Sequence, residues 1–158
     1  MAQIAANRLG NRRLTELFKK WSKKEIELGC SAIIDAVTRR MRISIAELPD
    51  GEYKFEDVLD DDGMGTENIP VVVKIVKQGE EIWLDFEGSG RQVRGNMNNS
   101  FAGLQASVLF ALKVLVDPDG PTNHGMLEPV HIKAPDGSVV NASFPVSYTH
   151  LRAHETID

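Results

Sequence analysis

The sequence contains little of what marks a secreted, membrane-spanning or nucleic-acid-binding protein. Its one cysteine, Cys30, excludes an internal disulfide framework and any multi-cysteine metal site, and it fits a reducing cytoplasm. No apolar run is long enough to cross a bilayer, and no secretory apolar core is seen, because residues 4–6 are followed at once by Asn7 and Arg8. The formal charge of −5 argues against nucleic-acid binding, which generally needs a basic surface. We therefore expect a cytoplasmic protein without a membrane or nucleic-acid partner.

What the sequence does contain is typical of a globular protein. Hydrophobic residues make up 42% of the 158 residues and charged residues 26%, a balance that supports a packed core and argues against extended disorder. At roughly 150 residues per domain, this length fits one domain or a part of a larger one.

The C-terminal residues resemble a sequencing remnant rather than a natural strand and loop. Residues 146–156 read VSYTHLRAHET, which matches the translation of a transposase adaptor at all eleven positions in one reading frame. We therefore interpret residues 146–158 as adaptor sequence and expect the natural sequence to differ after Pro145. His150 and His154, which stand at metal-ligand spacing, are excluded with it. Residues 1–145 then form a partial domain.

An amphipathic helix is predicted at the N-terminus. Leu14, Leu17, Phe18 and Trp21 recur at helical spacing, after a first half with small side chains that lets another backbone approach closely. Five basic side chains between residues 8 and 20 lie mainly off this stripe. They form a solvated face, or else a surface for an acidic partner or a phosphate group.

A second helix is predicted from residue 22 or 23 to about residue 45. Ser22 and Glu25 have the spacing of a capping box at its start. Cys30 lies on its apolar stripe, where we expect a small core side chain rather than a nucleophile.

The remaining segments predict hairpins on either side of a third helix. That helix is apolar almost all round, which predicts that it lies inside a larger protein. The order of elements predicts an α+β fold, with two N-terminal helices, β-hairpins and one buried helix, as a fragment of a larger domain. The expected strands are residues 53–58, 69–76, 82–86, 130–133 and 138–141, with turns at 78–80 and 135–137 and the third helix at 101–116.

An acidic run, Asp60-Asp61-Asp62-Gly63, is the most visible candidate site. It is not an EF-hand, because Met64 and Val71 occupy positions that need oxygen ligands. Two interpretations stay open. The run is a loose cation site, or it is a turn in which the aspartates accept hydrogen bonds from nearby backbone N–H groups.

Two polar loops are further candidates. Asn96, Asn98 and Asn99 precede the third helix, where they can cap it or present polar groups to a substrate beside its N-terminus. Asn123 and His124 lie in a second loop, and the histidine is either a general base or simply solvated. We predict substrate contacts for Asn96, Asn98 and Asn123, and we assign no catalytic residue and no metal ligand in this chain. The glycine-rich turn at residues 88–90 lacks the continuation of a nucleotide motif.

Four segments taken together resemble the hydantoinase B/5-oxoprolinase family. They are AQIAANRLGNRRLTEL (2–17), LPDGEYKFEDVLDDDG (48–63), LDFEGSGRQVRGNMN (84–98) and PTNHGMLEPVHIKAPDGSVVNASFP (121–145), in order and at family-like spacing. The resemblance covers residues 2–145. One departure is Thr38, because the family commonly carries an acidic residue at that position.

The resemblance implies a fragment of the B component of an ATP-dependent enzyme that opens cyclic amides of the hydantoin or 5-oxoproline type. A hydantoinase A-type partner would supply the ATP site, and a divalent metal would be held by ligands upstream of the matched region. No cofactor is therefore expected in this chain. Two alternatives stay open: a non-catalytic region that builds the core and a subunit interface, and a fragment of a ketone carboxylase of the acetone type.

Overall fold

Helices and one mixed sheet make up the structure, a computed structural model that describes residues 2–144. In chain order its elements are α1 (Ala2–Lys20), α2 (Lys23–Ala46), β1 (Gly51–Asp61), β2 (Glu67–Gln78), β3 (Glu81–Asp85), α3 (Phe101–Leu115), the short 3-10 helix η1 (His124–Met126) and β4 (Val130–Lys133). The α+β class predicted from the sequence is confirmed.

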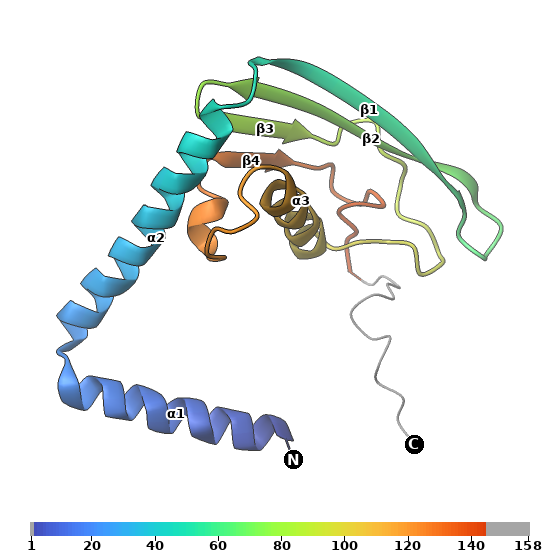
Figure 1. The fold of residues 1–158 in the computed structure, drawn as a ribbon. Coiled ribbons are helices and arrows are strands. Elements are labelled where there is room, and N and C mark those ends of the chain that lie inside the picture. The colour runs from blue at the N-terminus through green and yellow to red at the C-terminus, as the bar shows by residue number, and fades with distance from the viewer. Residues whose placement is uncertain (1, 145–158) are drawn as a thin grey trace.

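The sheet has the strand order β1-β2-β3-β4 and arches over α3 (Figure 1). β1 pairs with β2 and β2 with β3 in antiparallel fashion, whereas β3 and β4 run parallel. The registers place Tyr53 opposite Ile75, Ile75 opposite Leu84, and Ile82 opposite Val130. Alternate apolar residues of all four strands therefore share the face that looks toward α3.

The core lies where α3 and the C-terminal half of α2 meet this face. Its buried members include Val37, Met41 and Ile45 of α2, Ile69 of β2, Ile82 and Leu84 of β3, and Leu104, Val108 and Leu112 of α3. The opposite side of α3 is open, and Phe110 and Leu115 are 71% and 79% exposed. The described residues thus bury only one side of a helix whose composition predicts burial all round.

Two predictions about the strands were wrong. The expected hairpin of residues 130–133 and 138–141 does not form, because β4 pairs in parallel with β3 after α3 has carried the chain back. Residues 138–141 make only isolated bridges, between Arg91 and Ser138 and between Ser138 and Asn141. The first strand is longer than predicted and spans Gly51–Asp61, since its register with β2 continues to the end of their hairpin.

α1 and the first half of α2 form an arm that projects from the sheet (Figure 1). The predicted capping box at the start of α2 is confirmed, with Ser22 and Glu25 satisfying each other's backbone N–H groups. α1 has no buried residue, and Cys30 is exposed, so its prediction as a core side chain was wrong. The small side of α1 faces open space at Gly10.

The interpretation of residues 146–158 as adaptor sequence, including His150 and His154, concerns residues outside the described range and stays a prediction. Within residues 2–144, no helix combines the length and the apolar character needed to span a membrane.

Candidate functional site

The polar face of α2 holds the loop after α3 in place. Arg40 donates from Nε and Nη2 to the two carboxylate oxygens of Asp117, at 2.6 and 2.7 Å. The Asp117 side chain is only 10% exposed. These hydrogen bonds from Arg40 hold the pKa of Asp117 below its ordinary range. The ion pair therefore anchors the start of the segment that carries Asn123 and His124.

Two residues earlier on α2, Thr38 lies against η1. The Thr38 hydroxyl donates to the carbonyl of Ile34 at 3.0 Å. A Cβ at Gly125 would collide with that same carbonyl and would stand 2.9 Å from the Thr38 hydroxyl, so this position requires glycine. Asn123 caps η1 by accepting a hydrogen bond from the Gly125 N–H at 2.8 Å. Thr38, the departure from the family pattern, thus sits at the contact that positions Asn123.

A small polar pocket lies between η1, β4 and the first turns of α3. It measures about 250 Å³ and is lined by Phe101, Gln105, His124, Leu127, Glu128, Val130, His131 and Ile132. His124 Nε2 lies 3.4 Å from Glu128 Oε1. The predicted loop histidine therefore borders a cavity and has a carboxylate neighbour.

A second histidine at this pocket was not identified from the sequence. His131 Nε2 lies 2.8 Å from Glu81 Oε2, and Arg42 donates to the other Glu81 oxygen at 2.7 Å. The hydrogen bond from Arg42 is the main cause that lowers the pKa of Glu81, and the contact with His131 is the second. The His131 ring also stacks on Trp83 at a centroid distance of 5.0 Å. Because His131 lies 50 residues from Glu81 in sequence, no local spacing could reveal this network.

The loop that precedes α3 is organised by Asn98, which is 1% exposed. Its amide nitrogen donates to the carbonyls of Val93 and Gly95 at 2.8 and 3.0 Å, and its oxygen accepts from the Val93 N–H at 2.8 Å. Both amide hydrogens thus bond to backbone within the loop. Asn98 shapes the loop that presents Asn96, which is exposed.

Asp62 fixes this loop to the β1–β2 hairpin. Its carboxylate accepts hydrogen bonds from the backbone N–H groups of Met64, Thr66 and Gly95 at 2.8, 2.9 and 3.2 Å. The bond from Thr66 leads the causes that lower the pKa of Asp62 to about 2. The geometry favours the acidic-turn interpretation over a cation site. Residues 2–144 hold no group of three or more His, Cys, Asp or Glu arranged to bind a metal ion.

The glycine-rich turn at residues 88–90 packs closely against β2. The Ser89 hydroxyl donates to the Val72 carbonyl at 3.1 Å and accepts from the Val72 N–H at 3.0 Å. A Cβ on Gly90 would stand 2.9 Å from Ile69 Cγ2. The turn therefore serves contact with β2, and its geometry does not fit a nucleotide cradle.

The two predicted loops make separate contacts. Asn98 bonds within its own loop, whereas Asn123 caps η1 beside α2.

The fold as a whole is shared with large ATP-dependent enzymes. The structure of ATP-dependent caprolactamase from Pseudomonas jessenii matches with a TM-score of 0.79 and 28% identity, over 93% of this chain and 25% of that one. An acetone carboxylase structure matches with a TM-score of 0.70 but 13% identity, over 85% of this chain and 20% of that chain, which shows a common fold alone.

The family follows from the sequence. The model of the family "Hydantoinase B/oxoprolinase" matches residues 1–157, and the chain belongs to this family. It is 33% identical to the 5-oxoprolinase of Saccharomyces cerevisiae over 144 residues, which cover 89% of this chain and 11% of the yeast protein. It is 28% identical to the caprolactamase subunit beta of Pseudomonas jessenii over 151 residues, or 94% of this chain and 26% of that subunit. The chain thus spans about a quarter or less of these relatives.

Proposed function

We propose that this chain is part of the B component of an ATP-dependent hydrolase that opens cyclic amides of the hydantoin or 5-oxoproline type. The similarity to caprolactamase carries the proposal, because it combines 28% identity with a TM-score of 0.79 over 93% of the chain. The 5-oxoprolinase relative acts on another cyclic amide and is 33% identical. By contrast, the match to acetone carboxylase has only 13% identity and gives no support for ketone carboxylation as the reaction.

A cyclic amide is a poor electrophile. In this proposal, ATP is used to activate its carbonyl oxygen. We place the ATP site in a hydantoinase A-type partner and the divalent metal elsewhere in the B component. Two observations support this placement: the glycine-rich turn at residues 88–90 packs against β2, and residues 2–144 hold no group of residues arranged to bind a metal ion. The ATP requirement and the single cysteine both fit our placement of the protein in the cytoplasm.

The proposed contribution of this chain is to present polar loops to the ring. Of the predicted substrate contacts Asn96, Asn98 and Asn123, we propose that Asn96 and Asn123 contact the ring and that Asn98 holds the loop of Asn96. The geometry supports different roles for them, because Asn98 is buried and bonded within its loop whereas Asn123 stands on η1 next to the His124 pocket. The alternative is that these amides only build a subunit core.

A chimera of the caprolactamase from Pseudomonas jessenii separates these roles. Residues 2–144 replace the matching segment of its subunit beta, which is co-expressed with the other subunit. We expect ring opening of caprolactam, hydantoin or 5-oxoproline, coupled to ADP release. Asn123→Ala in the chimera should lower turnover without loss of assembly.

Unchanged turnover of the Asn123→Ala chimera would favour the purely structural role. An assembled and folded chimera that releases no ADP with any of the three cyclic amides would contradict the proposed function.

A further inference from the structure

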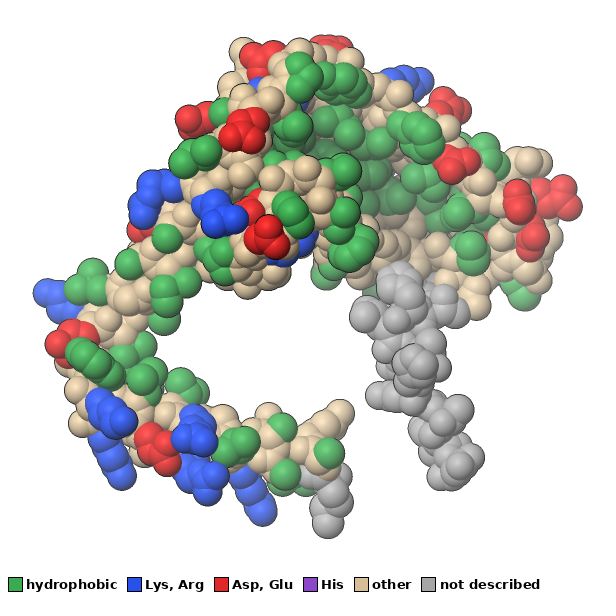
Figure 2. All heavy atoms as spheres, viewed as in Figure 1, with side chains coloured by type: hydrophobic (Ala, Val, Ile, Leu, Met, Phe, Trp, Pro, Cys, Tyr) green, Lys and Arg blue, Asp and Glu red, His purple; other side chains and the backbone are tan. Residues whose placement is uncertain are grey.

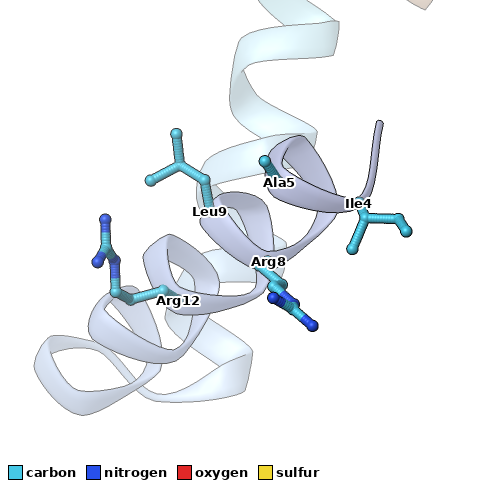
Figure 3. Close-up of a pocket in the computed structure, with 5 residues that line it drawn as sticks. All are labelled: Ile4, Ala5, Arg8, Leu9 and Arg12. Atoms are coloured by element: carbon cyan, nitrogen blue, oxygen red, sulfur yellow. The ribbon is translucent and has the colours of Figure 1, made fainter. Parts of the chain in front are cut away.

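Three cavities formed by the described residues differ in what they offer to a small polar molecule. The groove beneath the sheet has a volume of about 560 Å³ and shows as a gathering of hydrophobic side chains in Figure 2. Its one charged side chain among residues 2–144 is Lys77, which already donates to the Leu48 carbonyl and to Asp50 at 2.6 and 2.7 Å. The hollow on α1 (Figure 3) is lined, among the described residues, by that helix alone, with Arg8 and Arg12 at its border. The groove is therefore nearly apolar, and the hollow on α1 lacks a second wall.

The third cavity, the pocket between η1, β4 and the first turns of α3, has a divided lining. Its apolar side chains are Phe101, Leu127, Val130 and Ile132. Its polar side chains are Gln105, His124, Glu128 and His131. The volume of about 250 Å³ is below the roughly 300–1,000 Å³ of pockets that hold drug-sized ligands. The pocket therefore suits a single small ring that is apolar on one side and polar on the other.

The polar side of this pocket is held in a fixed geometry. His131 Nε2 lies 2.8 Å from Glu81, and Arg42 donates to the other oxygen of Glu81 at 2.7 Å. The imidazole also stacks on Trp83, with the ring centroids 5.0 Å apart. Contacts from α2 and β3 thus hold this residue of β4 in place before any ligand arrives. A preformed wall lowers the cost of ordering side chains on binding.

Gln105 is a polar residue of this pocket that lacks a partner. It is half-buried, and within residues 2–144 its carboxamide makes no hydrogen bond. A primary carboxamide offers a carbonyl acceptor and, on the same side, an N–H donor. Because a polar group that is shielded from water without a partner is costly, this position favours a ligand that pairs with both atoms.

A cyclic amide has the matching arrangement of donor and acceptor. A small ring forces its amide into the cis form, so that the N–H and the C=O point to the same side, whereas amides in a linear chain are trans. The cis edge can form two parallel hydrogen bonds with a primary carboxamide, and a trans amide can form only one of them. Caprolactam, hydantoin and 5-oxoproline all present this cis edge. Their ring carbons match the apolar side of the pocket.

We propose that this pocket binds the ring of the cyclic amide and that Gln105 recognises its cis amide edge. The assignment rests on the proposed function and adds the residue that selects cyclic over linear amides. His124 directly follows Asn123, so the pocket lies beside a substrate contact already proposed. A protein surface laid over the same pocket would remove water from two imidazoles and the Glu128 carboxylate, which is costly.

The first test measures binding to the full chain by NMR, with γ-butyrolactam as the probe. We expect the side-chain amide signals of Gln105 to shift and to saturate. N-methyl-γ-butyrolactam has the same ring without the N–H donor, and N-methylacetamide is a linear trans amide. Each should bind at least about tenfold more weakly, because a hydrogen bond of the pair is lost.

Variants of the chain extend this test, with binding followed at the imidazole signals of His124 and His131. Gln105→Met keeps the length of the side chain but removes the donor and the acceptor. It should abolish the preference for γ-butyrolactam over its N-methyl derivative. The matched control Gln3→Met makes the same change at an exposed position of α1 and should leave the preference intact.

The second test uses the chimera with the caprolactamase subunit. Gln105→Met should raise the KM for caprolactam by about tenfold or more without loss of assembly, whereas Gln3→Met should leave KM unchanged. If another part of the larger protein covers the pocket, the KM of the chimera will not respond to Gln105→Met, and the inference is overturned.

Equal affinity of the chain for γ-butyrolactam and its N-methyl derivative would also overturn the inference, while leaving the proposed function standing. Conversely, an assembled chimera that releases no ADP, together with saturable lactam binding at Gln105, would contradict the proposed function and support the binding site.

Discussion

The two halves of α2 share one apolar periodicity, but only the C-terminal half is buried. In the body, Met41 and Ile45 are 1% and 0% exposed beneath the sheet. In the arm, Ile33 on the same stripe is 61% exposed, and Cys30 is exposed as well. The difference teaches that periodicity selects which face of a helix is apolar, whereas only the rest of the fold decides whether that face is covered. The body and the arm should therefore respond differently to matched substitutions.

The largest difference is expected for truncation of apolar side chains. Met41→Ala removes a fully buried side chain and should lower the free energy of unfolding by about 2–5 kcal/mol. Leu28→Ala, at an exposed position of the arm, should change it by no more than about 0.5 kcal/mol. Urea unfolding of both variants measures the two values. Equal losses would show that the arm is packed as tightly as the body.

Truncation of hydrogen-bonding side chains should give a smaller contrast. Asn98→Ala leaves the carbonyls of Val93 and Gly95 without their side-chain donor, and should lower the free energy of unfolding by about 1–3 kcal/mol. Thr15→Ala removes a single exposed bond to the Asn11 carbonyl, and should cost less than about 0.5 kcal/mol. Both values can be read from thermal or urea unfolding. If Asn98→Ala were neutral, the loop would not depend on its amide.

Acid should weaken the body through Asp62. Its pKa falls from an ordinary 3.8 to about 2 in the folded chain, so its charged form stabilises the fold fully above about pH 4. That contribution is lost as the pH falls from about 4 toward 2, where the folded chain also binds the proton. Asp62→Asn should therefore lower Tm at pH 7, and the difference from wild type should shrink toward pH 2. The control Asp60→Asn changes an exposed carboxylate at the end of β1 and should show no such convergence.

The smallest expected effect is a gain in the arm. A Cβ at Gly29 meets no atom within 4 Å, so Gly29→Ala should stabilise α2 locally by about 0.5–1 kcal/mol through helix propensity. Hydrogen exchange of the arm amides measures this gain. The matched change Gly95→Ala in the body should instead destabilise the chain, because its Cβ would collide with the Asp62 carbonyl. Slower exchange in the body than in the arm would sharpen the comparison.

Local signals predicted the elements well and their partners poorly. Helical spacing and the Ser22–Glu25 capping box located α2, and the turn at residues 78–80 located the β2–β3 hairpin. The parallel pairing of β4 with β3 was not predicted. A hairpin is the shorter connection, and nothing in residues 130–133 distinguishes a parallel from an antiparallel partner strand.

The candidate site shows the same limit. Asn98 and Asn123 were singled out because they lie in polar loops, the first of them between a glycine-rich turn and the third helix. Their separate backbone contacts depend on the folded chain. The Arg42–Glu81–His131 network joins three elements and has no local sequence signature. Cys30 was placed in a core because its stripe continues into the buried half of α2, although that half alone is covered.

The parallel pairing of β3 with β4 has a consequence for how the chain is made. Its register joins Ile82 to Val130, so the edge of β3 has no neighbour until the ribosome has released the residues of β4. During synthesis, the β1–β2–β3 meander can form from local contacts while that edge and the apolar α3 stay available to other nascent chains. The strand that covers the edge of β3 is therefore made about 45 residues later in the chain, and during that interval the edge can pair with strands of other chains.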